Sequence, residues 1–221
     1  MIQDNIREVL STLPDGVRLV AVSKFHPIEA LQEAYDGGQR IFGESKVQEM
    51  TAKHEQLPTD IEWHFIGHLQ TNKVKYIAPF VALIHGVDSY KLLCEINRQG
   101  QRVGRIIPCL IQLHVAQEET KFGFSPEECL QMFEDGEWRT LPYVSIHGLM
   151  GMASNTDDMA QVRREFATLG KLFSQVREKY FSDRAEFCEL SMGMSDDYPI
   201  AIEEGSTLVR VGSRIFGHRV Y

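Results

Sequence analysis

The sequence predicts an α/β protein with a single (β/α)8 barrel of the TIM type, and three observations lead to this fold class. Short apolar runs rich in β-branched residues recur about eight times, and most are followed by a stretch with the periodicity of an amphipathic helix. Strands that alternate with helices pair in parallel through right-handed crossovers, and about eight such units can close a barrel. Polar and glycine residues gather directly after the runs, where such a barrel has its pocket. A doubly wound open sheet is the competing architecture.

The expected strands are spaced so that a helix fits between most neighbours. In chain order they are Val17–Ser23, Arg40–Phe42, Glu62–Ile66, Val81–Gly86, Ile106–Leu113, Tyr143–Gly148, Ala185–Leu190 and Thr207–Val211. The polar or glycine residues at or just after their ends are Lys24, Glu44, His68, Asp88, His114, Gly148–Gly151, Ser191, and Arg210 with Gly212. The carboxyl ends of barrel strands carry the chemistry of this fold, so we expect a functional site among these residues.

Helix signals fall between the strands. Pro27 and Pro126 stand where helices begin, since proline suits the first helical turn, and Asp36-Gly37-Gly38 has the composition of a helix end. No repeat, low-complexity tract or linker interrupts the pattern, so the sequence predicts one domain over residues 1–221. The longest helix is expected after the sixth strand, where apolar residues recur at helical spacing: Val162, Phe166, Leu169, Leu172, Phe173 and Val176.

Composition narrows the class of protein. The 221 residues include 23 Lys and Arg against 31 Asp and Glu, and the net charge of −8 argues against a general nucleic-acid binder. The longest stretch without a charged residue, 140–156, contains Pro142 and several polar residues, so no membrane span is expected. The N-terminus lacks the apolar core of a secretory signal, and we expect a cytoplasmic protein.

The four cysteines are widely spaced and form no C-x-x-C pair. This spacing gives no indication of a zinc ribbon or a thioredoxin-like site. We expect free thiols, with Cys109 and Cys188 in the core because each lies within an apolar run.

Lys24 directly follows the first apolar run. An ammonium that is partly desolvated at a barrel mouth, near other cations, has a lowered pKa and can become the free amine that attacks an aldehyde. A lysine at a strand end is, on that observation alone, more often a solvated surface group.

Two segments near the C-terminus indicate an anion site. Glycine after the last run lets the backbone N–H groups of Gly212 and Ser213 approach an anion, and the loops after the last two barrel strands often bind phosphate. Ser195 follows a glycine turn and is expected to cap a helix whose N–H groups face the same anion. Each segment is also compatible with a purely structural turn.

The histidines leave a second chemistry open. His64 and His68 are four residues apart, but Phe65-Ile66-Gly67 between them indicates a strand that enters a turn, which is unlike a helical zinc motif. His85, Asp88, His114 and His147 could converge at a barrel mouth and hold a metal. Buried hydrogen bonding by these histidines is the simpler interpretation, and a barrel metal-dependent hydrolase is the rival one.

A set of short motifs, in order along nearly the whole chain, resembles the pyridoxal phosphate homeostasis proteins, the YggS-like family. The motifs are Ala21-Val22-Ser23-Lys24, Phe42-Gly43-Glu44, Val47-Gln48-Glu49, His64-Phe65-Ile66-Gly67-His68-Leu69-Gln70-Thr71-Asn72-Lys73, Val87-Asp88-Ser89, His147-Gly148-Leu149-Met150, Leu190-Ser191-Met192-Gly193-Met194-Ser195, and Val209-Arg210-Val211-Gly212 with Ile215-Phe216-Gly217.

The resemblance implies a barrel similar to the N-terminal domain of alanine racemase that carries pyridoxal 5′-phosphate as a Schiff base. It implies that Lys24 forms this bond, that Arg210 faces the pyridine nitrogen, and that Ser195 holds the phosphate with the backbone of Gly212 and Ser213. Further cofactor contacts are expected at Ser45, Ser191 and Met192. The chain departs from the family at Ser45 and Lys46, where many members have Asn-Tyr, and the resemblance implies that the residue at position 45 lies close to the cofactor ring.

The implied function is pyridoxal phosphate homeostasis without robust catalysis, in a monomer that binds the cofactor and exchanges it with apo-enzymes. An arginine at the ring nitrogen donates a hydrogen bond but does not readily protonate the ring, which weakens its use as an electron sink. Racemisation also needs a second acid/base, which the racemases take from a tyrosine outside this barrel. A small pyridoxal phosphate-dependent amino-acid racemase is the enzymatic alternative.

Overall fold

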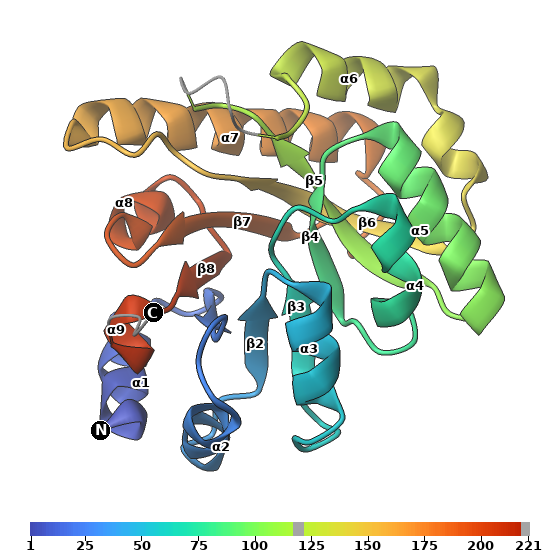
Figure 1. Cartoon of the computed structure of the whole chain (residues 1–221). Helices are drawn as coiled ribbons and strands as arrows, with labels where there is room; N and C mark the ends of the chain where they lie inside the picture. Colours follow the sequence, from blue (N-terminus) through green and yellow to red (C-terminus); the bar gives the residue numbers. More distant parts are fainter. Residues whose placement is uncertain (117–121, 218–221) are drawn as a thin grey trace.

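Eight parallel strands close into a barrel in chain order, and β1 pairs with β8 to complete the ring (Figure 1). The structure is a computed structural model and describes residues 1–116 and 122–217. The strands are β1 Arg18–Val22, β2 Ile41–Glu44, β3 Glu62–Phe65, β4 Leu83–Val87, β5 Ile107–Leu113, β6 Val144–Gly151, β7 Glu189–Met194 and β8 Leu208–Val211. The predicted closed barrel is confirmed, and the open sheet is excluded by the β1–β8 pairing.

Helices connect the strands and cover the outside of the barrel (Figure 1). They are α1 Ile2–Ser11, α2 Ile28–Asp36, α3 Val47–His54, α4 Val74–Ile77, α5 Tyr90–Val103, α6 Pro126–Asp135, α7 Met159–Tyr180, α8 Tyr198–Glu203 and α9 Ser213–Phe216, with 3-10 turns at Thr71–Lys73 and Glu137–Thr140. The first helix packs beside the last, and the Asn5 side chain donates a hydrogen bond to the Ile215 carbonyl at 2.9 Å.

Local sequence explains where several helices begin and end. Pro126 is the first residue of α6, and Ser125 and Glu128 form a capping box in front of it. Helix α2 begins after Pro27 and ends at Gly37-Gly38, as predicted. The long helix α7 buries the expected apolar face against the barrel.

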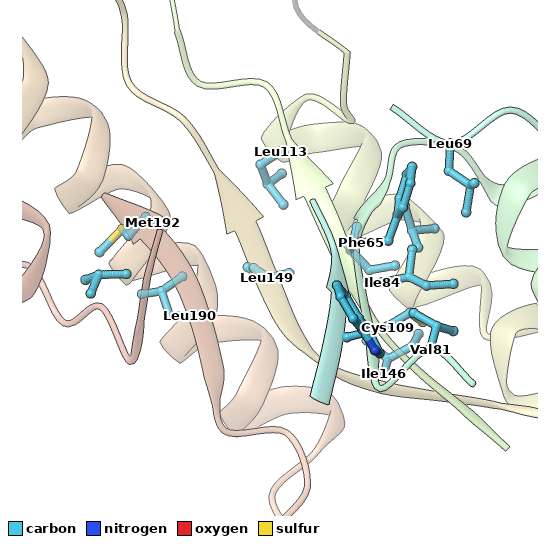
Figure 2. Packing of buried hydrophobic residues seen from close by; sticks show 14 of the residues in the cluster. Phe65, Leu69, Val81, Ile84, Cys109, Leu113, Ile146, Leu149, Leu190 and Met192 are labelled. Carbon is cyan, nitrogen blue, oxygen red and sulfur yellow. The ribbon is translucent and has the colours of Figure 1, made fainter. Parts of the chain in front are cut away.

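The core has two layers because successive side chains of a strand point to opposite faces. The larger layer lies between the strands and the helices, and Figure 2 shows part of it, including Leu149, Leu190 and Met192. A small cluster from alternate strand positions fills the barrel interior: Val20, Leu83, Leu110, Met150 and Leu208.

The seventh strand begins later than the sequence predicts. The run Ala185–Leu190 is not the strand, because β7 spans Glu189–Met194. Phe187 is fully buried and stacks on Phe173 of α7 and on Phe181, with ring centroids 5.1 and 4.2 Å apart. It therefore packs in the core layer between the strands and the helices, and is not part of a strand. Ser191 therefore lies within the strand and not after it.

The cysteine prediction is correct in part. The described cysteines are free thiols, and Cys109 is fully buried. Cys188 is exposed, contrary to expectation: it precedes β7, and its neighbour Phe187 is the residue that packs into the outer layer of the core. None of the helices in the two described ranges is both long enough and apolar enough to cross a membrane.

Candidate functional site

A cavity of about 470 Å³ opens at the carboxyl ends of the strands. Its walls come from residues at or after the ends of β1, β2, β3, β6, β7 and β8, which is where a barrel of this type holds its ligands. The lining residues are Val22, Lys24, His26, Ser45, Ile66, Met152, Met194, Ser195, Asp196, Arg210, Gly212, Ser213 and Gly217. Six of the eight sequence-predicted site residues are among them, and the other two are Ser191 and Met192.

Lys24 stands two residues beyond the end of β1 and is half-buried in the cavity wall. Strand β1 places it there because Val20 and Val22 point to the barrel interior, and Lys24 continues the same alternation. Phe25, the next residue, has a φ of +68°, so the chain turns sharply directly after the lysine.

Arg210 projects from β8 into the barrel and is only 4% exposed. Its guanidinium donates hydrogen bonds to the Ser191 carbonyl at 3.0 Å, to the Gly151 carbonyl at 3.1 Å and to the Ser191 hydroxyl. Burial lowers the pKa of Arg210 to about 10, and the Asp197 carboxylate acts in the opposite direction. The side chain stays protonated at neutral pH and supplies a fixed cation at the cavity wall.

Ser191 does not line the cavity, but its carbonyl and hydroxyl oxygens accept hydrogen bonds from Arg210. Its hydroxyl oxygen also lies 2.8 Å from Nδ1 of His85, and Nε2 of His85 lies 2.9 Å from Nδ1 of His64. Because a guanidinium only donates, the Ser191 hydroxyl accepts from Arg210, and its own proton can be donated to His85. A buried polar chain thus runs from the cavity into the barrel.

His64 and His85, the two histidines of this hydrogen-bonded series, are neutral. Burial lowers the pKa of His64 to about 3, and burial, assisted by the positive charges of Arg210 and Arg18, holds the pKa of His85 well below its ordinary value. The sequence offered no signal for this arrangement, because the residues stand on β3, β4, β7 and β8 and meet only when the barrel closes.

The turns after β7 and β8 lie against each other at the cavity. The Gly212 N–H donates to the Ser195 hydroxyl at 3.3 Å, so these two predicted residues are neighbours. A Cβ on Gly212 would lie 3.0 Å from the Val22 carbonyl oxygen, so glycine permits the close approach of the turn to β1.

Ser195 does not cap a helix, contrary to the sequence prediction. Helix α8 begins at Tyr198, and Asp197 is the residue that precedes it. The chain first makes a turn in which Gly193 has a φ of +94° and the Met194 N–H donates to Asp197 Oδ1 at 2.6 Å. This turn directs Ser195 to the cavity, so its hydroxyl contacts Gly212, the residue before α9, instead of the start of α8.

Met192 does not reach the cavity with its side chain. It is fully buried in the outer layer of the core, between the barrel and its helices (Figure 2). The reason is strand alternation, since Ser191 beside it points into the barrel. Sequence reasoning missed His26 and Asp196, which line the cavity two residues after Lys24 and one residue after Ser195. His26 stacks on Phe216 of α9 with ring centroids 4.9 Å apart.

The convergence of histidines that a metallohydrolase would use is not found. His85 lies inside the barrel, whereas His147 lies near Glu189 and Arg18, the first residues of β7 and β1. Asp88 pairs with His68, with 2.7 Å between Oδ2 and Nδ1. Within residues 1–116 and 122–217, no three His, Cys, Asp or Glu side chains form a group that could hold a metal ion.

Comparison with known proteins identifies the family. The family model of the alanine racemase N-terminal domain matches residues 1–220. A pyridoxal phosphate homeostasis protein of Aquifex aeolicus is 40% identical over 92% of this chain and 88% of its own length. The corresponding protein of Haemophilus influenzae is 39% identical over 93% of this chain and 86% of its own length. This chain belongs to the pyridoxal phosphate homeostasis proteins, within the alanine racemase N-terminal domain family.

Solved structures of PipY and of alanine racemases have the same fold. PipY of Synechococcus elongatus without pyridoxal phosphate superposes with a TM-score of 0.91 at 36% identity, over 98% of this chain and 100% of PipY. The form of PipY with pyridoxal phosphate bound gives a TM-score of 0.88 at 35% identity, with the same coverage. An alanine racemase of Clostridium difficile gives a TM-score of 0.81 at 14% identity over 98% of this chain and 56% of the racemase, so this likeness concerns the fold alone.

Proposed function

We propose that this pyridoxal phosphate homeostasis family member binds pyridoxal 5′-phosphate in the 470 Å³ cavity, as a Schiff base on Lys24. The observation that carries the proposal is the meeting of an amine, a buried cation and two backbone turns in one cavity: Lys24, Arg210, Gly212 and Ser213 with Ser195. The pyridoxal phosphate bound to PipY, a relative with the same fold, supports the choice of ligand.

The donor set fits this ligand. When bound, the ligand supplies an aldehyde that captures amines reversibly. The neutral Nζ of Lys24 would add to the aldehyde carbon, and loss of one water would leave a C=N bond in place of the C=O bond. Ser195 and the N–H groups of Gly212 and Ser213 would hold the phosphate. Arg210 would donate to the ring nitrogen, and Ser45, which follows β2, is a candidate ring contact.

We further propose that the site stores and releases the aldehyde and that it does not turn over substrate efficiently. Arg210 is held by Ser191 and Gly151 and stays protonated at neutral pH, so it donates to a ring nitrogen without giving up its proton. Ring protonation is what makes the cofactor a strong electron sink, so its lack disfavours reactions that need a strongly stabilised carbanion, such as transamination.

Borohydride reduction tests the proposal. We expect the purified protein mixed with pyridoxal phosphate to turn yellow, and reduction to fix one adduct on the peptide that contains Lys24. The Lys24→Ala variant should gain no adduct at this site. Lys46→Ala is the matched control, because this exposed lysine stands at the rim, with its Nζ 4.7 Å from the Phe25 ring. An adduct that maps to Lys46 or Lys73, with Lys24 unmodified, would overturn the proposal.

The second candidate is a small amino-acid racemase. The observation that favours it is His26, an imidazole that lines the cavity together with Lys24 and could act as the second acid/base. Exchange of the α-hydrogen of amino acids with deuterated water distinguishes the two functions. Storage predicts no exchange above the level given by free pyridoxal phosphate, and rapid exchange that is lost in His26→Ala would establish the racemase.

The physiological setting is also a proposal. We propose a single domain over residues 1–221 that acts as a monomer in the cytoplasm and passes the cofactor to apo-enzymes. Sedimentation of the loaded protein tests the monomer. Activation of a pyridoxal phosphate-dependent apo-enzyme, faster with the loaded protein than with the same concentration of released cofactor, tests the delivery.

A further inference from the structure

The backbone on both sides of Lys24 is held by a set of polar side chains, which we call the Lys53 cluster and which consists of the buried Ser23, Glu44 and Lys53 and the partly buried Glu49. On the amino side of Lys24, the Ser23 hydroxyl donates to Glu44 Oε1 at 2.7 Å, and the Ser23 carbonyl accepts from Lys53 Nζ at 2.8 Å. On the carboxyl side, the Phe25 N–H donates to Glu49 Oε1 at 2.6 Å. The residues directly before and after Lys24 are thus both held by hydrogen bonds to this cluster.

Lys53 joins the two anchors. It is 5% exposed, and its Nζ contacts Glu44 Oε1 at 2.7 Å and Glu49 Oε1 at 2.8 Å, in addition to the Ser23 carbonyl. An ammonium has three protons, and these three acceptors use them all. The cluster lies on the outer face of the barrel strands. Glu44 is two residues after the outward-facing Phe42 of β2, so it points to the same face.

The hydrogen bond to Phe25 supports an unfavourable backbone conformation. Phe25 is the only non-glycine residue with positive φ in the described ranges, at +68°, a region that bulky side chains rarely adopt. Its side chain is 46% exposed, so close packing of the ring does not force this conformation. A charged acceptor on the amide is a strong local restraint, since hydrogen bonds to charged groups exceed neutral ones in strength.

We propose that Glu49 and Lys53 are positioning residues for Lys24: they fix the backbone on either side of it, so that its amine is delivered into the cavity. The inference rests on the proposed role of Lys24 and adds residues that contact neither the cavity nor its ligand. Glu49 acts directly on the Phe25 amide, and Lys53 acts by holding Glu49 and the Ser23 carbonyl in place.

Two substitutions at position 49 separate positioning from simple stability. Glu49→Gln removes the charge that faces Lys53 but keeps an oxygen that can accept from the Phe25 N–H, whereas Glu49→Ala removes both. If the residue acts only as a partner of Lys53, the two variants behave alike. If it positions the turn, Glu49→Gln retains most of the function and Glu49→Ala does not. Glu55→Ala, at an exposed carboxylate just after α3, is the matched control.

The cofactor-free protein gives the first readout. We expect amide hydrogen exchange at Phe25, measured by NMR, to be faster by at least about tenfold in Glu49→Ala than in the wild type, the equivalent of losing one hydrogen bond. Glu49→Gln and Glu55→Ala should stay near the wild-type rate. Equal exchange in Glu49→Ala and the wild type would overturn the inference.

The loaded protein gives the second readout. At a fixed, subsaturating concentration of pyridoxal phosphate, borohydride should fix about tenfold less adduct on Lys24 in Glu49→Ala than in the wild type. Phe25→Gly, introduced into Glu49→Ala, should restore part of this yield, because glycine adopts positive φ without strain. Absence of any rescue, or a yield in Glu49→Ala equal to that of the wild type, contradicts the positioning role.

Failure of the inference and failure of the proposed function give different results. If Lys24 is not the site of the imine, the wild type itself shows no adduct at Lys24, whereas the exchange difference at Phe25 remains. If the Lys53 cluster does not position the turn, the wild type shows the adduct, and Glu49→Ala matches it in both readouts. Circular dichroism of each variant establishes that the comparison is made between folded proteins.

Discussion

At the residue scale, burial decides the protonation states of His64 and His85. Each ring is almost completely removed from water, and a charged imidazole would lack solvent in the barrel interior. The neighbouring positive charge of Arg210 acts in the same direction on His85. The pair is therefore kept neutral, and a neutral His85 is a suitable partner for the Ser191 hydroxyl that contacts Arg210.

The neutral histidines predict a loss of stability in mild acid. The pKa of His64 is about 3 in the folded protein against 6.5 for an ordinary histidine, so the unfolded chain binds more protons between these values. Its contribution is complete above pH 6.5 and is lost as the pH falls toward 3. We expect about 2 kcal/mol of this loss at pH 5. Urea unfolding of the wild type and His64→Gln at pH 7 and pH 5 measures it, and equal losses in both proteins would refute the assignment.

Arg210 is predicted to set the electronic state of the bound ligand. Arg210→Gln keeps a polar side chain but removes the cation from the cavity, so we expect a shifted absorption spectrum of bound pyridoxal phosphate and about tenfold weaker binding. Arg214→Gln, at an exposed position of α9, is the matched control and should leave both unchanged. An Arg210→Gln spectrum identical to the wild type would place Arg210 away from the ring.

At the scale of the element, the β6–β7 pair shows why one glycine cannot be replaced. A Cβ on Gly148 would lie 1.7 Å from the Glu189 carbonyl oxygen, and its φ is +153°. The two strands approach each other through this position, where Gly148 is paired with Glu189 in the register. Strand β7 also carries Ser191, which accepts hydrogen bonds from Arg210. The Gly148–Glu189 pairing therefore helps to fix the position of the Arg210 guanidinium in the barrel.

Gly148→Ala should therefore destabilise the protein strongly. We expect a loss of about 3 kcal/mol in the free energy of unfolding, because the added methyl group forces β6 and β7 apart. Gly104→Ala is the control: it also has positive φ, +65°, but nothing lies within 4 Å of its Cβ position. Strain alone should cost about 1 kcal/mol there. Chemical denaturation measures both, and similar losses would show that the close approach carries no cost.

At the scale of the whole molecule, the cavity draws on six of the eight strand ends, so ligand binding should stabilise the barrel as a unit. Pyridoxal phosphate at about 100 times its Kd stabilises the native state by about 2.7 kcal/mol, which corresponds to a rise in Tm of about 5–10 °C for a chain of this size. Thermal unfolding with and without the ligand measures the shift.

Two controls assign this shift. Pyridoxine 5′-phosphate has the ring and the phosphate but no aldehyde, so its smaller shift reports the non-covalent contacts alone. The Lys24→Ala variant should respond to the two ligands equally. An equal response of the wild type to both ligands would mean that the amine of Lys24 adds nothing to binding.

Much of this molecule was predictable from sequence because the signals are local. Alternation of apolar runs with helical periodicity predicts the barrel, and proline and glycine mark the ends of α2 and α6. The carboxyl-end rule then selects Lys24, Arg210 and Gly212, which do line one cavity. The two wrong predictions also have local causes. The start of β7 was misplaced because the apolar Phe187 packs against α7 and not within the strand. Ser195 was wrongly predicted to cap a helix because a turn after Gly193 comes before α8, which begins only at Tyr198.

The linear pattern of this chain determined the barrel, the lysine after its first strand and the glycine turn after its last, since each depends on neighbours a few residues away. Only the closed tertiary structure decided that Ser191 and two histidines would support Arg210, and that Lys53 would anchor both neighbours of Lys24. The physical reason is that these contacts join strands and helices distant in sequence, and their geometry exists only after eight strands have paired in a ring.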